Sequence, residues 1–240
     1  MSSKLIIAGV NYSEHELGSI LSLLEPEQIE NTEILPSSTI DDIWLCWNRH
    51  QLIDILFLRL YPNNIADNCY YKLQHITQYR NKEHLPLLIV ANGLESIDFA
   101  YDLGATGFLV SPPERLRLHG FFAIAKEKAL SRREELLIYK KENFCCALPF
   151  SKILWVKTSQ QCAEIQCCCH SKPFTCGLSM PIDDLQNRLF NVSPGLLINM
   201  EHVYEVHSCF IVLADQEKTK FPISKDRLEE AQAAFMSISK

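Results

Sequence analysis

Short apolar runs alternate with amphipathic stretches through roughly the first 125 residues of this 240-residue chain. Parallel strands need long crossover connections, which are usually helices, so this alternation predicts a parallel sheet. The apolar runs carry almost no charge, as expected for strands that are covered on both faces. The expected strands span residues 4–10, 31–36, 54–60, 86–92 and 106–111.

Five helices are expected to connect or follow these strands. Ser13 precedes the first helix in the N-cap position, and Gly104 follows the fourth as a C-cap. Five strands that alternate with five helices are typical of a flavodoxin-like, doubly wound α/β domain. The expected helices span residues 13–24, 41–51, a stretch between 63 and 80, 94–104, and a segment from Pro113 to about residue 143.

The sequence changes character after Asn143. Strand-like segments are separated by turn residues, and two short helical patches interrupt them, at residues 181–190 and 224–238. Runs of strands with few helices predict a separate, mostly β domain. We therefore expect an α/β domain over residues 1–125, a helical linker over 126–143 and a mostly β domain over 144–240.

Composition narrows the class of protein. A hydrophobic fraction of 47% with 22% charged residues indicates a folded globular chain. The net charge of −6 argues against indiscriminate binding of nucleic acid, although from Phe144 on 9 basic residues nearly balance 10 acidic ones. No run of 18 apolar residues occurs, and the N-terminus is expected to form a strand instead of a signal peptide. We expect a cytoplasmic protein without a membrane span, whose ten cysteines are reduced.

The stretch PLLIVANGLESIDFAYDLGATGFLVSPPERL carries a family resemblance, together with the order of elements before it. The best matches to this family are the Gly104–Ala105 step, the strand end at Ser111–Pro112 and the start of the last helix near Leu116. Over residues 4–125 the chain resembles the receiver domain of response regulators. The resemblance implies a domain that accepts a phosphoryl group on an aspartate at the end of its third strand, next to a Mg²⁺ ion held by oxygen ligands.

The residues that carry this chemistry in receivers are absent from the matching positions. The acid pair after the first strand is replaced by Gly9 and Val10, and the acceptor aspartate by Arg59. The hydroxyl residue of the fourth strand is replaced by Ala91, and the lysine of the fifth by Ser111. We therefore expect a degenerate receiver that binds no Mg²⁺ and accepts no phosphoryl group here.

Two interpretations of Arg59 are open. Its cation could lock one conformer of the pocket, or its side chain could extend to solvent from the strand end, since no carboxylate at the end of the first strand remains to pair with it. Asp41 and Asp42 are too loosely placed to be named as partners. The output face of receivers, used for dimerisation, has aromatic counterparts here that could equally be core residues: Tyr101, Phe108, Phe121 and Phe122.

The second half resembles the LytTR family of DNA-binding modules over about residues 147–237. KILWVKTSQQ matches the opening strand, MPIDDLQNRLFNVSPGLLINMEHVYEV the helix and the hydrophobic strand before Asn199, and KFPISKDRLEEAQAAF the final strand and closing helix. This resemblance implies promoter DNA with direct repeats as the partner, read by loops in adjacent major grooves. Lysines and arginines near phosphates would supply most of the affinity.

Departures from the LytTR pattern weaken the expected DNA contacts. The loop after Phe190 reads Asn-Val-Ser-Pro-Gly, and Pro194 has no donor with which to read a base. Asn199 is expected to hold a turn by side-chain hydrogen bonds and not to contact DNA. The basic and polar groups that remain could equally be a solvated surface. They are Lys152, Lys157, Gln160, Gln161, Ser193, Lys225 and Arg227.

The CCCH run at residues 167–170 raises the question of a metal site. If the run continues a strand, Cys167 and Cys169 point to one face and Cys168 and His170 to the other. That alternation argues against a single tetrahedral site, so we predict no metal and regard the cysteines as small buried residues, with a redox switch as the alternative.

These observations together favour a transcription regulator of the response-regulator type. We expect a pseudo-receiver that acts without phosphorylation and forms a homodimer, followed by a DNA-binding LytTR-like domain. No catalytic motif or phosphate-binding glycine loop occurs, so we expect neither enzymatic activity nor a cofactor. The alternative is a protein-interaction adaptor that has lost both phosphotransfer and DNA readout.

Overall fold

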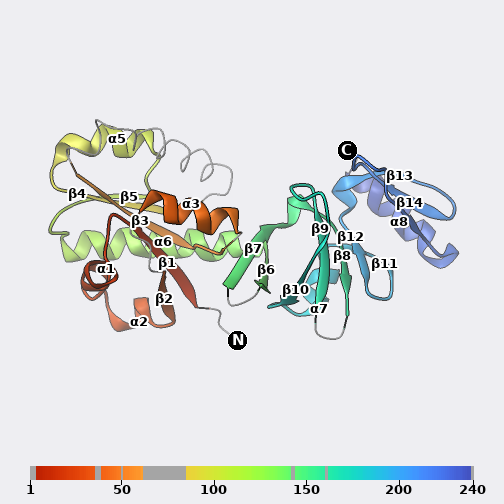
Figure 1. Cartoon of the computed structure of the whole chain (residues 1–240), viewed down its shortest axis with the longest axis horizontal. Helices are drawn as coiled ribbons and strands as arrows, with labels where there is room; N and C mark the ends of the chain where they lie inside the picture. The colour runs from red at the N-terminus through yellow and green to blue at the C-terminus, as the bar shows by residue number, and fades with distance from the viewer. Residues whose placement is uncertain are drawn as a thin grey trace. The chain divides into compact units, whose positions relative to one another are not determined.

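The computed structural model describes residues 4–35, 39–49, 51–61, 85–141, 144–159 and 162–238. The chain forms two compact units, Met1–Glu134 and Glu135–Lys240 (Figure 1). Among the described residues, no helix is both long enough and apolar enough to span a membrane.

The first unit is built on a five-stranded parallel sheet. Its strand order is β2-β1-β3-β4-β5, and every neighbouring pair is parallel. This is the flavodoxin-like order of doubly wound proteins, so the predicted fold class of the first half is confirmed. The strands are β1 (Leu5–Val10), β2 (Thr32–Leu35), β3 (Ile55–Leu60), β4 (Leu87–Ala91) and β5 (Gly107–Val110).

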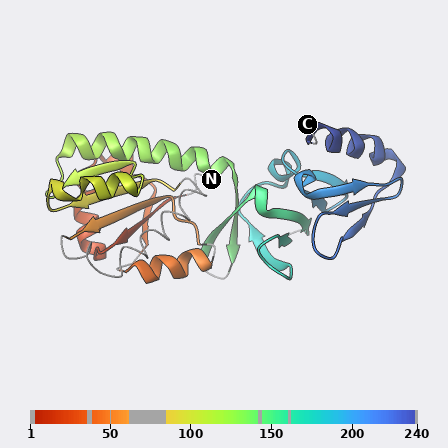
Figure 2. The same cartoon turned by 90° about the horizontal axis from the view of Figure 1, so that it is seen from above.

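Helices cover both faces of this sheet. Residues of α1 and α6 pack on one face, and residues of α3 and α5 pack on the other, as the view from above shows for α6 and α3 (Figure 2). The described helices are α1 (Glu14–Leu21), α2 (Pro26–Ile29), α3 (Ile40–Asn48), the short 3₁₀ helix η2 (Leu94–Ser96), α5 (Ile97–Asp102) and α6 (Arg115–Glu134). The helix expected between residues 63 and 80 lies outside the described residues.

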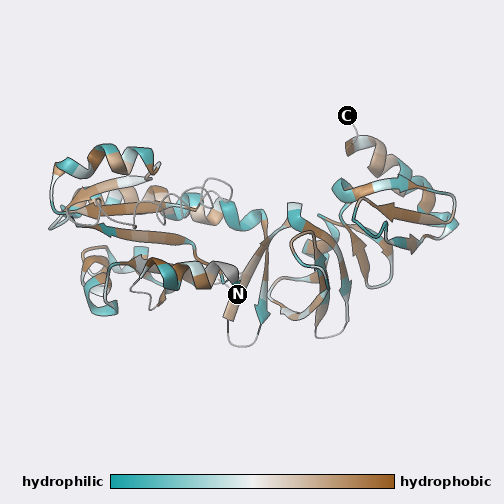
Figure 3. Ribbon diagram, turned by 45° about the horizontal axis from the view of Figure 1, so that its top comes forward, coloured by the Kyte–Doolittle hydropathy of each residue, from teal (hydrophilic) through white to brown (hydrophobic). Residues whose placement is uncertain are grey.

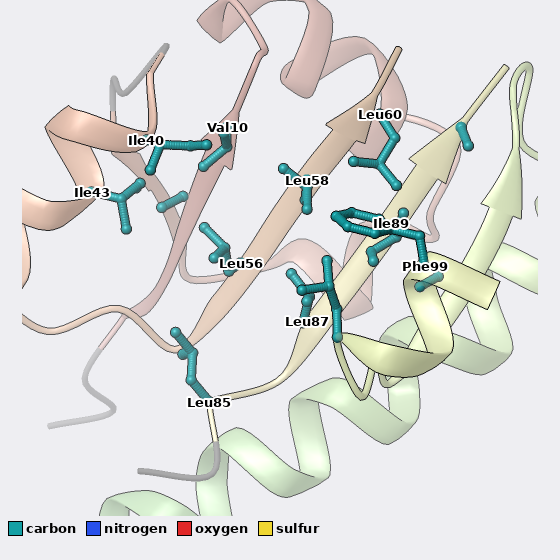
Figure 4. Close-up of a cluster of buried hydrophobic side chains, with 14 of the residues drawn as sticks. Val10, Ile40, Ile43, Leu56, Leu58, Leu60, Leu85, Leu87, Ile89 and Phe99 are labelled. Carbon is teal, nitrogen blue, oxygen red and sulfur yellow. The ribbon is translucent and has the colours of Figure 1, made fainter. Parts of the chain in front are cut away.

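Strand residues alternate between these two faces. Leu56, Leu58 and Leu60 of β3 belong to the cluster with α3 and α5 (Figure 4), whereas Ile55 and Phe57 belong to the cluster with α1 and α6. Because successive side chains of a strand point to opposite faces, this pattern explains why the central strands are apolar at nearly every position, with Arg59 of β3 as an exception. Brown colour along the central strands marks the same run of apolar residues (Figure 3).

The last helix of the first unit ends earlier than predicted. α6 stops at Glu134, and residues Leu136–Lys141 form strand β6, so the expected helical linker is wrong over its second half. β6 pairs antiparallel with β7 (Phe144–Pro149), and this pairing buries Leu137 and Tyr139. Along β6 the side chains of Leu136, Leu137 and Tyr139 are buried, and the backbone pairing with β7 is what makes the segment a strand.

The second unit is mostly β, as predicted. A seven-stranded antiparallel sheet has the order β11-β12-β8-β9-β10-β6-β7, and a three-stranded antiparallel sheet has the order β13-β14-β15. Its remaining strands are β8 (Ile153–Thr158), β9 (Ala163–Cys167), β10 (Phe174–Leu178), β11 (Phe190–Ser193), β12 (Leu196–Ile198), β13 (Val203–Val206), β14 (Phe210–Leu213) and β15 (Lys220–Pro222).

Short helices complete the second unit inside the two predicted patches. They are α7 (Ile182–Gln186) and α8 (Lys225–Ile238), with the 3₁₀ turns η3 (Phe150–Lys152) and η4 (Met200–His202). Leu228, Ala231 and Phe235 recur at helical spacing along α8 and pack against a cluster that includes Ile198 and Ile211. This apolar stripe attaches the closing helix to the small sheet.

Candidate functional site

The positions predicted to form the degenerate pocket lie at one edge of the parallel sheet. Gly9 and Val10 end β1, Arg59 is next to last in β3, and Ala91 ends β4. Ser111 follows β5 directly, and its N–H donates to the carbonyl of Ala91 at 2.7 Å. Parallel strands present their carboxyl ends at a common edge, which is where doubly wound proteins bind ligands.

The side chains at these positions are poorly suited to hold a cation. Val10 and Ala91 are fully buried and apolar, and Gly9 lies so close to its surroundings that an added Cβ would come within 2.9 Å of the Leu17 side chain. Neither Val10 nor Ala91 has an oxygen ligand of the kind that Mg²⁺ prefers.

Arg59 has a carboxylate partner that we did not expect from the sequence. It lies on the face of β3 covered by α1, and its Nη1 donates to Oε1 of Glu16 at 2.8 Å. The guanidinium carbon also lies 5.7 Å from the ring centroid of Tyr12 and 5.1 Å from that of Tyr61. The hypothesis that no carboxylate remains near the first-strand end is therefore wrong, because Glu16 supplies one from the following helix.

Glu16 is held in place by the start of its own helix. Its carboxylate accepts hydrogen bonds from the backbone N–H of Ser13 at 2.9 Å and from the Ser13 hydroxyl at 2.8 Å, while Ser13 caps α1. These bonds, together with the one from Arg59, lower the pKa of Glu16 to about 2. The predicted N-cap at Ser13 is confirmed, and the Ser-x-x-Glu spacing is a sequence signal that could have placed the Glu16 carboxylate but was not used.

Tyr12 and Asn11 also lie at this edge of the sheet, next to Arg59. Tyr12 is buried beside Arg59, and burial raises the pKa of its phenol above the ordinary value. Asn11 adopts a positive φ of 62° and donates from Nδ2 to the carbonyl of Arg59 at 3.0 Å. Asp42 instead accepts from Thr39 at the start of α3. The edge therefore holds a charge-compensated pair packed between two tyrosines.

The opposite edge of the sheet carries a second pair that the sequence did not reveal. Asp54 is fully buried and accepts from Arg133 Nε at 2.7 Å, from Arg133 Nη2 at 2.5 Å and from the Ile6 N–H at 2.6 Å. Arg133 also donates to the carbonyl of Lys4 at 2.6 Å, and Arg132 donates to that of Ile53 at 2.7 Å. These bonds join the end of α6 to the beginnings of β1 and β3.

The aromatic residues of the expected dimer face divide between surface and core. Phe122 is fully buried under the sheet, and Phe121 packs against Gly107. Tyr101 is 85% exposed on α5, and Leu116 is 79% exposed on α6. Tyr101 and Leu116 are therefore exposed apolar side chains on these two helices, whereas Phe122 belongs to the core.

The predicted DNA-contacting groups of the second unit fall into two sets. Lys157 of β8 pairs with Leu196 of β12, which in turn pairs with Ser193 of β11. Paired residues share a face, so Lys157 and Ser193 lie in one exposed row, two strand spacings or roughly 10 Å apart. Gln160 and Gln161 lie outside the described residues.

The second set lies at the start of α8. Lys225 is exposed in the first turn, and Arg227 pairs with Glu230 at 2.6 Å. Glu164 lies directly opposite Lys157 across β8 and β9. Acidic residues thus accompany basic ones in both sets and reduce the local positive potential.

Asn199 serves as a structural residue. It is buried, its Nδ2 donates to the carbonyl of Phe150 at 2.9 Å, and its Oδ1 accepts from the Glu201 N–H at 3.1 Å. The prediction that Asn199 holds a turn is confirmed.

The cysteine run differs from the prediction. β9 ends at Cys167, and the next two residues form a turn, so strand alternation does not extend through the run. Cys167 and Cys169 have their sulfurs 3.0 Å apart, and their ligand atoms and that of His170 all lie within 4.8 Å of one another. The hydrogen bond between the two thiols lowers the pKa of Cys169 to about 6 and raises that of Cys167. The geometric argument against a metal site is therefore wrong.

No family model and no curated protein matches this chain. Solved structures are similar to parts of it. A response regulator receiver protein from Pseudomonas putida is 13% identical, with a TM-score of 0.40, over 52% of this chain and 98% of its own. A LytTr DNA-binding domain from Bacillus cereus is 11% identical, with a TM-score of 0.33, over 42% of this chain and 95% of its own. A LuxR family DNA-binding response regulator from Silicibacter pomeroyi is 14% identical, with a TM-score of 0.40, over 51% of this chain and 93% of its own. The fold assignment itself rests on the strand order and register described above.

Proposed function

We propose that this chain is a cytoplasmic, DNA-binding transcription regulator of the response-regulator type that works without phosphorylation. The observation that carries the proposal is the Arg59–Glu16 pair at the carboxyl edge of the parallel sheet. In receivers that position holds the acceptor aspartate, and a guanidinium there can neither accept a phosphoryl group nor attract Mg²⁺. The residues quoted for the receiver and LytTR resemblances support the same proposal.

Control by contact replaces control by phosphate in this proposal. The receiver-like unit binds a partner or a second copy of the chain, and the exposed Tyr101 and Leu116 support an interface on the side of α5 and α6. The antiparallel unit contacts promoter DNA with direct repeats. No enzymatic step and no cofactor is part of the proposal.

DNA contacts in this proposal come from the exposed row with Lys157 and Ser193 and from the first turn of α8. Lysine contributes a compact charge to phosphate without the bidentate geometry of arginine. Because Arg227 is already paired with Glu230, Lys157 and Lys225 are the cations that we assign to phosphates. The expected affinity is modest and depends strongly on salt.

The test is binding of the full chain to fluorescent mixed-sequence duplexes over a range of salt concentrations. Each phosphate contact contributes a slope of about −0.9 to log K against log salt. Lys157→Ala and Lys225→Ala should each make the slope shallower by about one contact. Lys4→Ala, in the other unit, is the matched control and should leave it unchanged. Absence of binding at low salt would overturn the DNA-binding part.

A protein-interaction adaptor is the second candidate. Pro194 in the loop after β11, Glu164 opposite Lys157 and the exposed apolar side chains of the first unit favour it. An adaptor predicts no salt-dependent DNA binding but retained self-association or partner binding that Tyr101→Lys abolishes. The salt titration of DNA binding described above separates the two candidates, whereas size-exclusion chromatography with light scattering on wild type and Tyr101→Lys tests the interface that both share.

A further inference from the structure

The turn after β9 brings three metal-ligating side chains together within four residues of sequence. Cys167 is fully buried at the end of the strand, whereas Cys169 and His170 are exposed. The two sulfurs are 3.0 Å apart, and the sulfurs and an imidazole nitrogen all lie within 4.8 Å of one another. One member of the cluster is therefore anchored in the core, and two are exposed to solvent.

Backbone hydrogen bonds hold this turn in shape. Cys168 N–H donates to the carbonyl of Lys152 at 2.9 Å, and His170 N–H donates to that of Cys167 at 3.3 Å. The Gln166 side chain donates from Nε2 to the carbonyl of His170 at 2.6 Å and to that of Cys167 at 3.0 Å. Four bonds across so short a segment mean that little further ordering is needed when a ligand binds.

The cluster has the chemistry of a thiophilic metal site. Thiolate and imidazole are ligands that Zn²⁺ prefers, with bonds of about 2.3 Å to sulfur and about 2.0–2.1 Å to nitrogen. Two sulfurs on one tetrahedral ion are roughly 3.8 Å apart, so the pair would have to open by less than about 1 Å. A rotation of the exposed Cys169 side chain supplies a movement of this size.

We propose that Cys167, Cys169 and His170 bind one Zn²⁺ ion, with the fourth position open to water. A disulfide between the two cysteines would make no use of the His170 imidazole, whose ring packs edge-on against Phe174 at 5.7 Å, and this third ligand group beside the two sulfurs is what favours a metal. The proposal does not depend on DNA binding or on the pseudo-receiver, so its failure would leave the proposed function standing.

The test is a Zn²⁺ titration of the full, reduced chain against a chromophoric chelator, without oxygen. Wild type should take up one ion tightly, and Cys169→Ser and His170→Ala should each weaken binding by on the order of 100-fold. Cys168→Ser and Cys209→Ser remove exposed thiols outside the cluster and are the matched controls. Co²⁺ in place of Zn²⁺ should give a sulfur-to-metal absorption band that Cys169→Ser reduces and Cys168→Ser does not.

Several results would overturn the proposal. Wild type could fail to bind Zn²⁺ at micromolar concentration, or Cys168→Ser could weaken binding as much as Cys169→Ser. Peptide mapping that finds a Cys167–Cys169 disulfide in air, together with no metal uptake after reduction, would assign the pair to thiol chemistry instead. Circular dichroism of each metal-free variant checks that a loss of binding does not come from a loss of folding. Both variants should fold, because Cys169 and His170 are exposed.

Discussion

The two edges of the parallel sheet each carry an arginine–carboxylate pair, and the pairs differ in burial. At the carboxyl edge, the side chains of Arg59 and Glu16 are 24% and 48% exposed. At the amino edge, those of Arg133 and Asp54 are 9% and 0% exposed. A hydrogen bond from Arg59 Nη1 joins the first pair, whereas Asp54 receives two bonds from its arginine and also accepts one from a backbone N–H.

This difference in burial decides how much each pair contributes to stability. Removing one partner of a buried pair leaves an uncompensated charge in a medium that solvates it poorly, whereas water screens a pair at the surface. The amino edge therefore anchors the end of α6 firmly. The pair at the carboxyl edge is partly exposed to water, so breaking it should cost less.

The largest expected effect is that of Asp54→Ala. It should lower the free energy of unfolding of the first unit by about 3–5 kcal/mol, because Arg133 is left buried without its counter-ion. Urea denaturation measures this loss, and hydrogen exchange at the Ile6 amide, which donates to Asp54, reports it locally. Glu33→Ala, which removes the exposed partner of Lys4, is the control and should change little. Equal effects of the two variants would contradict the comparison.

The next effect is on the titration of Glu16. Its pKa of about 2 lies below the ordinary value of 4.5, so its contribution to stability is present at neutral pH and is lost as pH falls from about 4.5 toward 2. Carbon-13 NMR of the side-chain carboxyl measures this pKa directly. In Arg59→Met it should rise only in part, because the hydrogen bonds from Ser13 are the larger cause. A wild-type pKa near 4.5 would show that the capping box does not hold the carboxylate.

A smaller effect is expected from breaking the exposed pair itself. Arg59→Met keeps an unbranched apolar side chain near Tyr12 and Tyr61 and removes the charge. The midpoint of urea unfolding should shift far less than in Asp54→Ala, because water solvates the released Glu16. A loss as large as that of Asp54→Ala would mean that both edges are structural anchors.

For the last variant, Arg59→Asp, we expect no gain of phosphorylation. Arg59→Asp restores a carboxylate at the acceptor position but should still not be labelled by acetyl phosphate in the presence of Mg²⁺. Gly9 and Val10 supply no carboxylate ligand for the metal, and Ser111 supplies no cation for the phosphoryl group. Mass spectrometry of the treated chain detects an added phosphoryl group, with an intact receiver as the positive control. Labelling of wild type on an aspartate of the first unit would remove the basis of the proposed function.

Local patterns were enough for much of the fold. The five parallel strands, the N-cap at Ser13 and the turn held by Asn199 all follow from residue types at short spacing. The end of α6 did not follow, because Leu136–Lys141 can continue a helix by pattern and becomes a strand only by pairing with β7. The turn after Cys167 was not predicted either, because a run of cysteines gives no sign of where a strand ends.

By itself, the sequence determined the alternation that makes the parallel sheet and the apolar or basic residue types at the ends of β1, β3 and β4. Both are properties of residue type and order. Only the tertiary structure decided which charges pair, because Arg59 and Glu16 are 43 residues apart and Asp54 and Arg133 are 79 residues apart. It also decided how strongly each pair matters, since the free energy of an ion pair depends on the water that the surrounding fold excludes.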